Sequence, residues 1–197
     1  MSPLLRASGV IHRPVVTMQG EDIAQVKDVV YSAGGGAVGG FTLAGRGLFA
    51  GPLKTALPWA SVRALGPDAV MIEDEQALAP TPDVLGEIAS AGGSGGDVLG
   101  SEVLTEDGVA LGTVADVILE VTGRDGSCDV VGYEVATDPS GTKERMFVPL
   151  PDTLAASAEH LVVPTAARDF ATRDLAGLAD AVTAFRNQLG ERADAAQ

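Results

Sequence analysis

Short apolar runs, separated by glycine-rich or polar turns, follow one another along most of the chain. The two longest, Ile23–Tyr31 and Ala110–Val121, are dense in valine, and each comes after a short apolar run and a turn that contains glycine. Runs bounded by such turns are typical of β-strands. We therefore expect strands at Pro14–Thr17, Ile23–Tyr31, Ala37–Leu43, Leu57–Ala60 and Ala69–Ile72, and again at Glu102–Thr105, Ala110–Val121, Cys128–Ala136, Arg145–Pro149 and His160–Val163.

The second set of strands repeats the first. Val15–Val30 aligns with Val103–Ile118 at a constant offset of 88 residues, which places Asp28 on Asp116. Because the offset changes only in glycine-rich or polar stretches, where insertions are tolerated, the alignment indicates an internal duplication. Matches at offsets of 92 and 91 residues pair Gly40–Phe41 with Gly132–Tyr133, Pro58 with Pro149 and Val70–Ile72 with Leu161–Val163.

The pattern predicts a mainly β fold of two tandem small β-barrels, because closure removes the exposed edges of so small a sheet. We expect the barrels at 5–78 and 97–170, with a linker at 79–96 and a C-terminal helix and tail at 171–197. In the linker, Pro82–Ala89 predicts a short helix that begins at Thr81. In the tail, apolar residues recur at helical spacing, which favours docking on a barrel and leaves self-association or partner binding open. They are Leu175, Leu178, Val182, Phe185 and Leu189.

Both copies carry a short strand, a glycine turn and then a valine-rich strand with a central aspartate, as in Val26–Val30 and Val114–Ile118. This arrangement resembles the PRC-barrel domain, a family that includes the cytoplasmic part of the photosynthetic reaction-centre H subunit. Val38–Leu43, Leu57–Ala60 and Asp68–Ile72 continue the resemblance. It implies a barrel that binds protein partners or assembles complexes, with no catalytic residues established for the family.

Charge narrows the choice of partners. The net charge is −14 and the isoelectric point is near 4.3, so the chain repels nucleic-acid phosphates and anionic membranes at long range. A single cysteine, Cys128, gives no support for secretion. Neither a secretion signal nor an apolar run of membrane-spanning length is visible. We expect a cytoplasmic protein with no direct nucleic-acid partner.

Few residues of the sequence indicate an enzyme active site. His12 and His160 lie at non-equivalent places in the repeat, and no nucleophile motif accompanies them. Glu73–Glu75 is better explained as a solvated strand exit than as a metal site. The glycine-rich segments Gly34–Gly40 and Gly45–Gly51 lack the spacing of a nucleotide-binding loop. We expect no catalytic residue, no metal and no cofactor, and we expect Asp28 and Asp116 to face solvent or cap nearby turn amides.

One loop stands apart from its counterpart in the repeat. Ala44–Thr55 is long for a hairpin connection and places apolar residues between two cations, whereas Thr137–Lys143 is shorter and polar. This composition is typical of a small protein interface, and equally of a lid that folds over its own barrel. The candidate interaction residues are Arg46, Leu48, Phe49, Leu53 and Lys54.

The sequence therefore predicts a non-enzymatic interaction or scaffold protein, with a stress-related role considered. Its partner is unidentified, and self-association through the loop or the C-terminal helix stays open. One alternative is a ribosome- or RNA-processing-associated accessory factor, which rests on family analogy alone. The other is a small-ligand-binding barrel, which is disfavoured because a cavity usually needs more strands.

Overall fold

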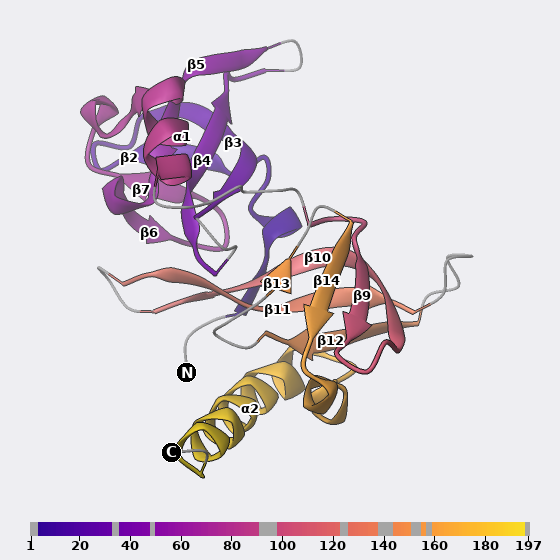
Figure 1. Ribbon diagram of the computed structural model, residues 1–197. Coiled ribbons are helices and arrows are strands. Elements are labelled where there is room, and N and C mark those ends of the chain that lie inside the picture. The colour runs from indigo at the N-terminus through magenta and orange to yellow at the C-terminus, as the bar shows by residue number, and fades with distance from the viewer. Residues whose placement is uncertain are drawn as a thin grey trace. The chain divides into compact units, whose positions relative to one another are not determined.

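The computed structural model describes residues 4–32, 36–47, 50–90, 98–122, 126–137, 144–150, 155–156 and 159–195 (Figure 1). The chain forms two compact units. The first comprises residues 1–95 and 120–129, and the second comprises residues 96–119 and 130–197. Strands dominate both units, as the apolar pattern predicted.

The sheet of the first unit has the strand order β6-β7-β2-β3-β4-β5-β8. All neighbours are antiparallel except β2 and β7, which run parallel. Short 3-10 helices lie at Ala7–Gly9, Trp59–Ser61 and Glu75–Ala77. The strands of this sheet are β2 (Pro14–Thr17), β3 (Asp22–Tyr31), β4 (Val38–Ala44), β5 (Pro52–Pro58), β6 (Val62–Leu65), β7 (Val70–Ile72) and β8 (Ala79–Pro80). A further short strand, β1 (Leu4–Arg6), comes before them in the chain and is not part of this sheet.

The sheet of the second unit follows the order β12-β11-β10-β9-β14-β13, which repeats the path of the first from β5 through β6. Its parallel pair, β9 with β14, corresponds to β2 with β7. The registers also correspond, because Val103 faces Leu161 where Val15 faces Val70. The strands are β9 (Glu102–Thr105), β10 (Ala110–Val121), β11 (Cys128–Ala136), β12 (Arg145–Pro149), β13 (Ala155–Ala156) and β14 (His160–Val163).

The turn after the first strand is built in the same way in both copies. Thr17 donates its N–H to the Glu21 carbonyl at 2.9 Å, and its hydroxyl accepts the Glu21 N–H at 3.1 Å. Thr105 makes the same two contacts with Val109 at 2.9 and 3.0 Å. Between them, Gly20 and Gly108 adopt φ of +87° and +81°, which side chains rarely tolerate. The aligned threonines and glycines therefore mark one shared turn.

Side chains at aligned positions also fill the two cores. Alternation along β2 buries Val15 and Thr17 and leaves Val16 half-buried between them. The same alternation buries Val103 and Thr105 on β9. The core pairs that align are Val15 with Val103, Val26 with Val114, Phe41 with Tyr133 and Leu57 with Val148.

Two helices complete the chain. α1 (Thr81–Ser90) begins at the threonine predicted from the sequence. α2 (Leu175–Ala195) packs against β12, as Figure 1 shows, and buries Leu178, Val182 and Phe185. The Phe185 ring lies 5.3 Å from that of Phe170, in the 3-10 helix Thr165–Phe170. This confirms that the apolar stripe of the tail docks on the second sheet. Among the described residues, no helix has the length and apolar character needed to cross a membrane.

Candidate interaction sites

The loop between β4 and β5 is shorter than the sequence indicated. β4 ends at Ala44 and β5 begins at Pro52, so the connection is 45–51 rather than 44–55. Proline at the first position of a strand loses no ladder hydrogen bond, which lets β5 begin earlier than expected. Leu53, half-buried, and Lys54, exposed, therefore lie on a strand. Leu48 and Phe49 lie outside the described residues.

Hydrogen bonds close the base of this loop. The Gly45 N–H donates to the Gly51 carbonyl at 3.1 Å, and the Ala50 N–H donates to the Gly47 carbonyl at 3.1 Å. Gly47 adopts φ of +104°, which a residue with a side chain would adopt only with strain. The described residues at the base of the loop therefore continue the hairpin of β4 and β5.

An ion pair ties the loop to the start of β3. Arg46 Nε lies 3.1 Å from Asp22 Oδ2. The Gln25 side chain donates to the Gly45 carbonyl at 3.2 Å from the same strand. The Arg46 side chain is 62% exposed in this pair and therefore stays accessible, and an exposed ion pair of this kind contributes little stability.

The mid-strand aspartates, aligned in the repeat, have different environments. Asp28 is exposed and accepts hydrogen bonds from Lys27 and Thr42, both at 3.0 Å. Asp116 is buried, with 5% of its surface exposed, and one of its oxygens accepts the Val117 N–H at 2.8 Å. The expectation of a solvent-facing carboxylate is therefore confirmed for Asp28 and wrong for Asp116, since both faces of β10 are covered at that point.

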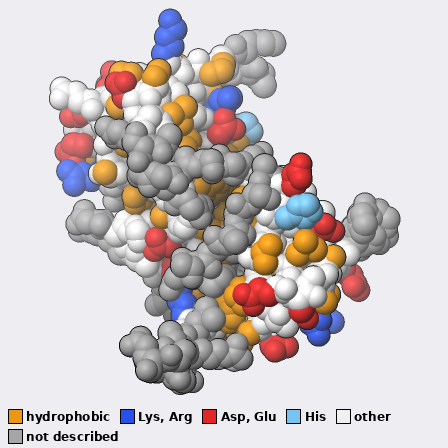
Figure 2. Space-filling view, viewed as in Figure 1, with side chains coloured by type: hydrophobic (Ala, Val, Ile, Leu, Met, Phe, Trp, Pro, Cys, Tyr) orange, Lys and Arg blue, Asp and Glu red, His pale blue; other side chains and the backbone are white. Residues whose placement is uncertain are grey.

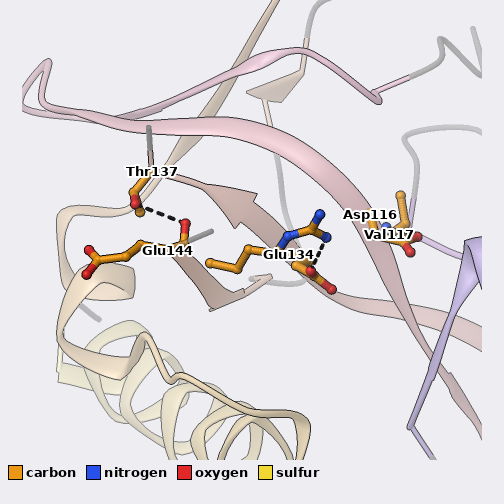
Figure 3. A network of polar contacts seen from close by, with 6 residues as sticks. Asp116, Val117, Glu134, Thr137 and Glu144 are labelled. Atoms are coloured by element: carbon orange, nitrogen blue, oxygen red, sulfur yellow. Dashed lines mark hydrogen bonds and ion pairs between the residues drawn. The ribbon is translucent and has the colours of Figure 1, made fainter. Parts of the chain in front are cut away.

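A second buried carboxylate lies on the neighbouring strand β11. Glu134 has 1% of its surface exposed and accepts a hydrogen bond from Arg145 Nη1 at 2.5 Å (Figure 3). Because a buried carboxylate is costly without a partner, the arginine offsets its charge. The hydrogen bond and the charge of Glu134 raise the pKa of Arg145, which keeps the guanidinium protonated. The pair is thus a fixed ionic feature of the second sheet.

A cavity of about 330 Å³ opens beside this ion pair, at the edge of β12. Its walls carry two arginines, one carboxylate and two threonines, and they mix polar with apolar surface. The lining residues are Thr137, Glu144, Arg145, Met146, Ala171, Thr172 and Arg173. Sequence reasoning missed this site, although Arg145 aligns with Lys54 of the predicted interaction residues at the offset of 91.

The side chains with nucleophilic or metal-binding chemistry lie apart from one another. Cys128 is buried, and desolvation together with the charge of Asp129 raises its pKa to about 12. His160 lies 3.5 Å from Glu102 on β9, and both side chains are about half exposed. Within the described part of the chain, no three His, Cys, Asp or Glu side chains gather in a position to hold a metal ion.

Comparison with known proteins identifies the first unit. A scan against protein-family models matches residues 3–78 to the PRC-barrel domain. A search of curated proteins finds none that matches the chain. The matched segment contains β1 to β7, and with them the glycine turn and the mid-strand aspartate on which the resemblance rested. Residues 3–78 of this chain are therefore a PRC-barrel domain.

Proposed function

We propose that the protein is a non-enzymatic binding module or scaffold, and that its PRC-barrel domain presents the loop at 45–51 to a protein partner. The observation that carries this proposal is the construction of the loop base. Backbone hydrogen bonds close it at Gly45 and Gly51, and Arg46 lies beside them with its Nε 3.1 Å from Asp22 Oδ2. A loop held at its base loses less conformational entropy on binding than a free one.

The residue types of the loop agree with this role. Leu48 and Phe49 supply apolar chemistry, and Arg46 and Lys54 flank them with positive charge in a chain of net charge −14. Aromatic residues and arginine are enriched in protein interfaces, where a few of them dominate the binding energy. Figure 2 shows acidic side chains scattered over one face of the molecule, with basic side chains among them.

Affinity capture with the full-length chain tests the proposal. The bait is compared with an Arg46→Glu, Phe49→Ser double variant and with Lys27→Glu, a matched charge reversal on β3 of the same domain. We expect one protein to be recovered by the wild type and by Lys27→Glu, and to be lost from the double variant. Recovery of ribosomes or RNA would overturn the proposal. Recovery of the same protein by the double variant would exclude the loop.

A further inference from the structure

The outer edge of β12 carries an unused backbone hydrogen-bonding position. In an antiparallel pair, successive residues alternate between those that bond the partner strand and those whose N–H and C=O point the other way. The Thr137 N–H donates to the Glu144 carbonyl at 3.2 Å, so Glu144 bonds toward β11. The next residue, Arg145, lies opposite Ala136. Because the two kinds of pair alternate, Arg145 and Ala136 form a non-hydrogen-bonded pair. The Arg145 N–H and C=O therefore point away from β11.

Phe147 confirms this direction. It lies two residues beyond Arg145 on β12, and its N–H and C=O bond Thr172 at 2.8 and 2.9 Å. This isolated bridge fills the outer edge of β12 at Phe147. After Thr172 the chain turns into α2, whose first turn Asp174 caps by accepting the Gly177 N–H at 2.7 Å. Among the described residues, no segment pairs with the outer edge of β12 at Arg145 as Thr172 does at Phe147.

The cavity of about 330 Å³ lies at this position, since Arg145 lines it together with Thr172 and Arg173. That volume is at the small end of ligand sites, and it suits a few extended residues rather than a folded partner. An amide N–H and C=O offered by one residue match the acceptor and donor of a peptide unit, the arrangement by which extended peptides add to sheet edges. The backbone chemistry of the site therefore selects an extended chain.

The charges select its side chains. Two arginines and one carboxylate, Glu144, line the cavity, so cations outnumber carboxylates at its wall. Arg173 is exposed there, and Arg145 keeps 57% of its side chain exposed beside Glu134. Arginine binds carboxylates through charge-assisted hydrogen bonds. We propose that the edge of β12 at Arg145 binds a short extended peptide segment that carries a carboxylate side chain. This site lies in the second unit and is independent of the loop at 45–51.

Hydrogen exchange followed by NMR on the full-length chain tests the backbone part of the proposal. The probe is an acetylated, amidated hexapeptide, Thr-Val-Glu-Val-Glu-Thr, with two comparison peptides. One has lysine in place of both glutamates, and the other is N-methylated at alternate amides along one edge. We expect the acidic peptide to slow exchange of the Arg145 amide about tenfold, because it gains a hydrogen bond. The Met146 amide, which already faces β11, should not change.

Binding titrations test the side-chain part. Arg173→Gln and Arg173→Glu should weaken the acidic peptide about tenfold or more, since each removes a charge-assisted contact. Arg168→Glu is the matched control, because Arg168 is an exposed cation of the same unit outside the cavity wall, and it should bind as the wild type does. Thermal unfolding of each variant shows that the fold is kept.

Four results would overturn the proposal. The first is binding without protection of the Arg145 amide. The second is equal affinity for the acidic, lysine-containing and methylated peptides. The third is the absence of any binding at millimolar peptide. Binding that survives Arg173→Glu but is lost with Arg46→Glu would also overturn it, because it would assign the peptide to the loop of the first domain.

Discussion

Nη1 of Arg145 lies 2.5 Å from Oε1 of Glu134, and the two ends of this ion pair differ sharply in exposure. The arginine side chain is 57% exposed and keeps its hydration, whereas the glutamate side chain is 2% exposed. A carboxylate removed from water depends on a nearby positive charge far more than an exposed cation depends on its partner. Changes at the two residues should therefore have unequal effects.

Replacing the arginine alone should unfold the protein at lower temperature. Arg145→Met leaves the Glu134 carboxylate without this counter-charge, so we expect its melting temperature to fall by several degrees. The Glu134→Gln, Arg145→Met double variant should recover most of the loss, because the buried charge of Glu134 is removed together with its counter-charge. Thermal unfolding of the four-member cycle, followed by circular dichroism, measures the coupling. Equal melting temperatures for Arg145→Met and for the control Arg168→Met would contradict the expectation.

Cys128 should resist thiol reagents in the folded protein. It is fully buried, and its pKa is raised to about 12, so very little thiolate exists at neutral pH and the sulfur is inaccessible. Alkylation by iodoacetamide, followed by mass spectrometry, should be negligible without denaturant and complete in urea. Rapid labelling of the native protein would show that β11 opens at Cys128.

Stability should fall as the solution becomes alkaline. Burial raises the pKa of Cys128 from 9.0 and that of Tyr133 from 10.0, in each case to about 12. The folded protein therefore retains these protons more strongly than the unfolded chain, and the stability they contribute is full below pH 9 and is lost as the pH rises toward 12. Urea unfolding across this range should show a decreasing free energy of unfolding. Tyr133→Phe should flatten the decrease above pH 10, because it removes the group whose proton the folded state retains.

Two aligned glycines should be intolerant of alanine. A Cβ at Gly40 would lie 2.5 Å from the Leu57 carbonyl oxygen, and one at Gly132 would lie 2.6 Å from that of Val148. Each substitution forces neighbouring strands apart, which we expect to cost about 1–3 kcal/mol of unfolding free energy. Gly86→Ala, in α1 with open space around it, should instead stabilise the protein by about 0.5–1 kcal/mol. Urea unfolding of the three variants measures these changes in the free energy of unfolding. An unchanged free energy of unfolding for Gly132→Ala would contradict the expected clash between its Cβ and β12.

Much of the fold follows from the sequence because both sheets are made of strands with a regular apolar pattern. The duplication predicted which residues would share a turn, and Thr17 with Gly20 does match Thr105 with Gly108. β6 (Val62–Leu65) escaped prediction, because Arg63 and Ala64 are exposed and its alternation is weak. Its place in the sheet comes from pairing with β7, a contact between segments that local pattern does not reveal.

The sites were harder to predict than the strands. Arg46 could be found from charge and loop length, although its partner Asp22 was not apparent until the loop was seen beside β3. Glu134 escaped notice, because a carboxylate within a strand usually faces solvent and nothing local to β11 reveals that both its faces are covered. The cavity was not predicted for a similar reason, since its walls combine residues of 137–146 with 171–173, which are distant from them in sequence.

The Glu134–Arg145 pair also bears on how the two halves of the chain tolerate mutation. At the aligned positions the first copy has Thr42 and Lys54, and Thr42 bonds an aspartate that is itself exposed. A substitution at Thr42 or at Lys54 alone should therefore cost little stability. In the second copy a change at Arg145 alone removes the counter-charge of a buried carboxylate, so we expect tolerated substitutions to change Glu134 and Arg145 together. Of the two aligned pairs of positions, the pair in the second unit should therefore be the less tolerant of single substitutions.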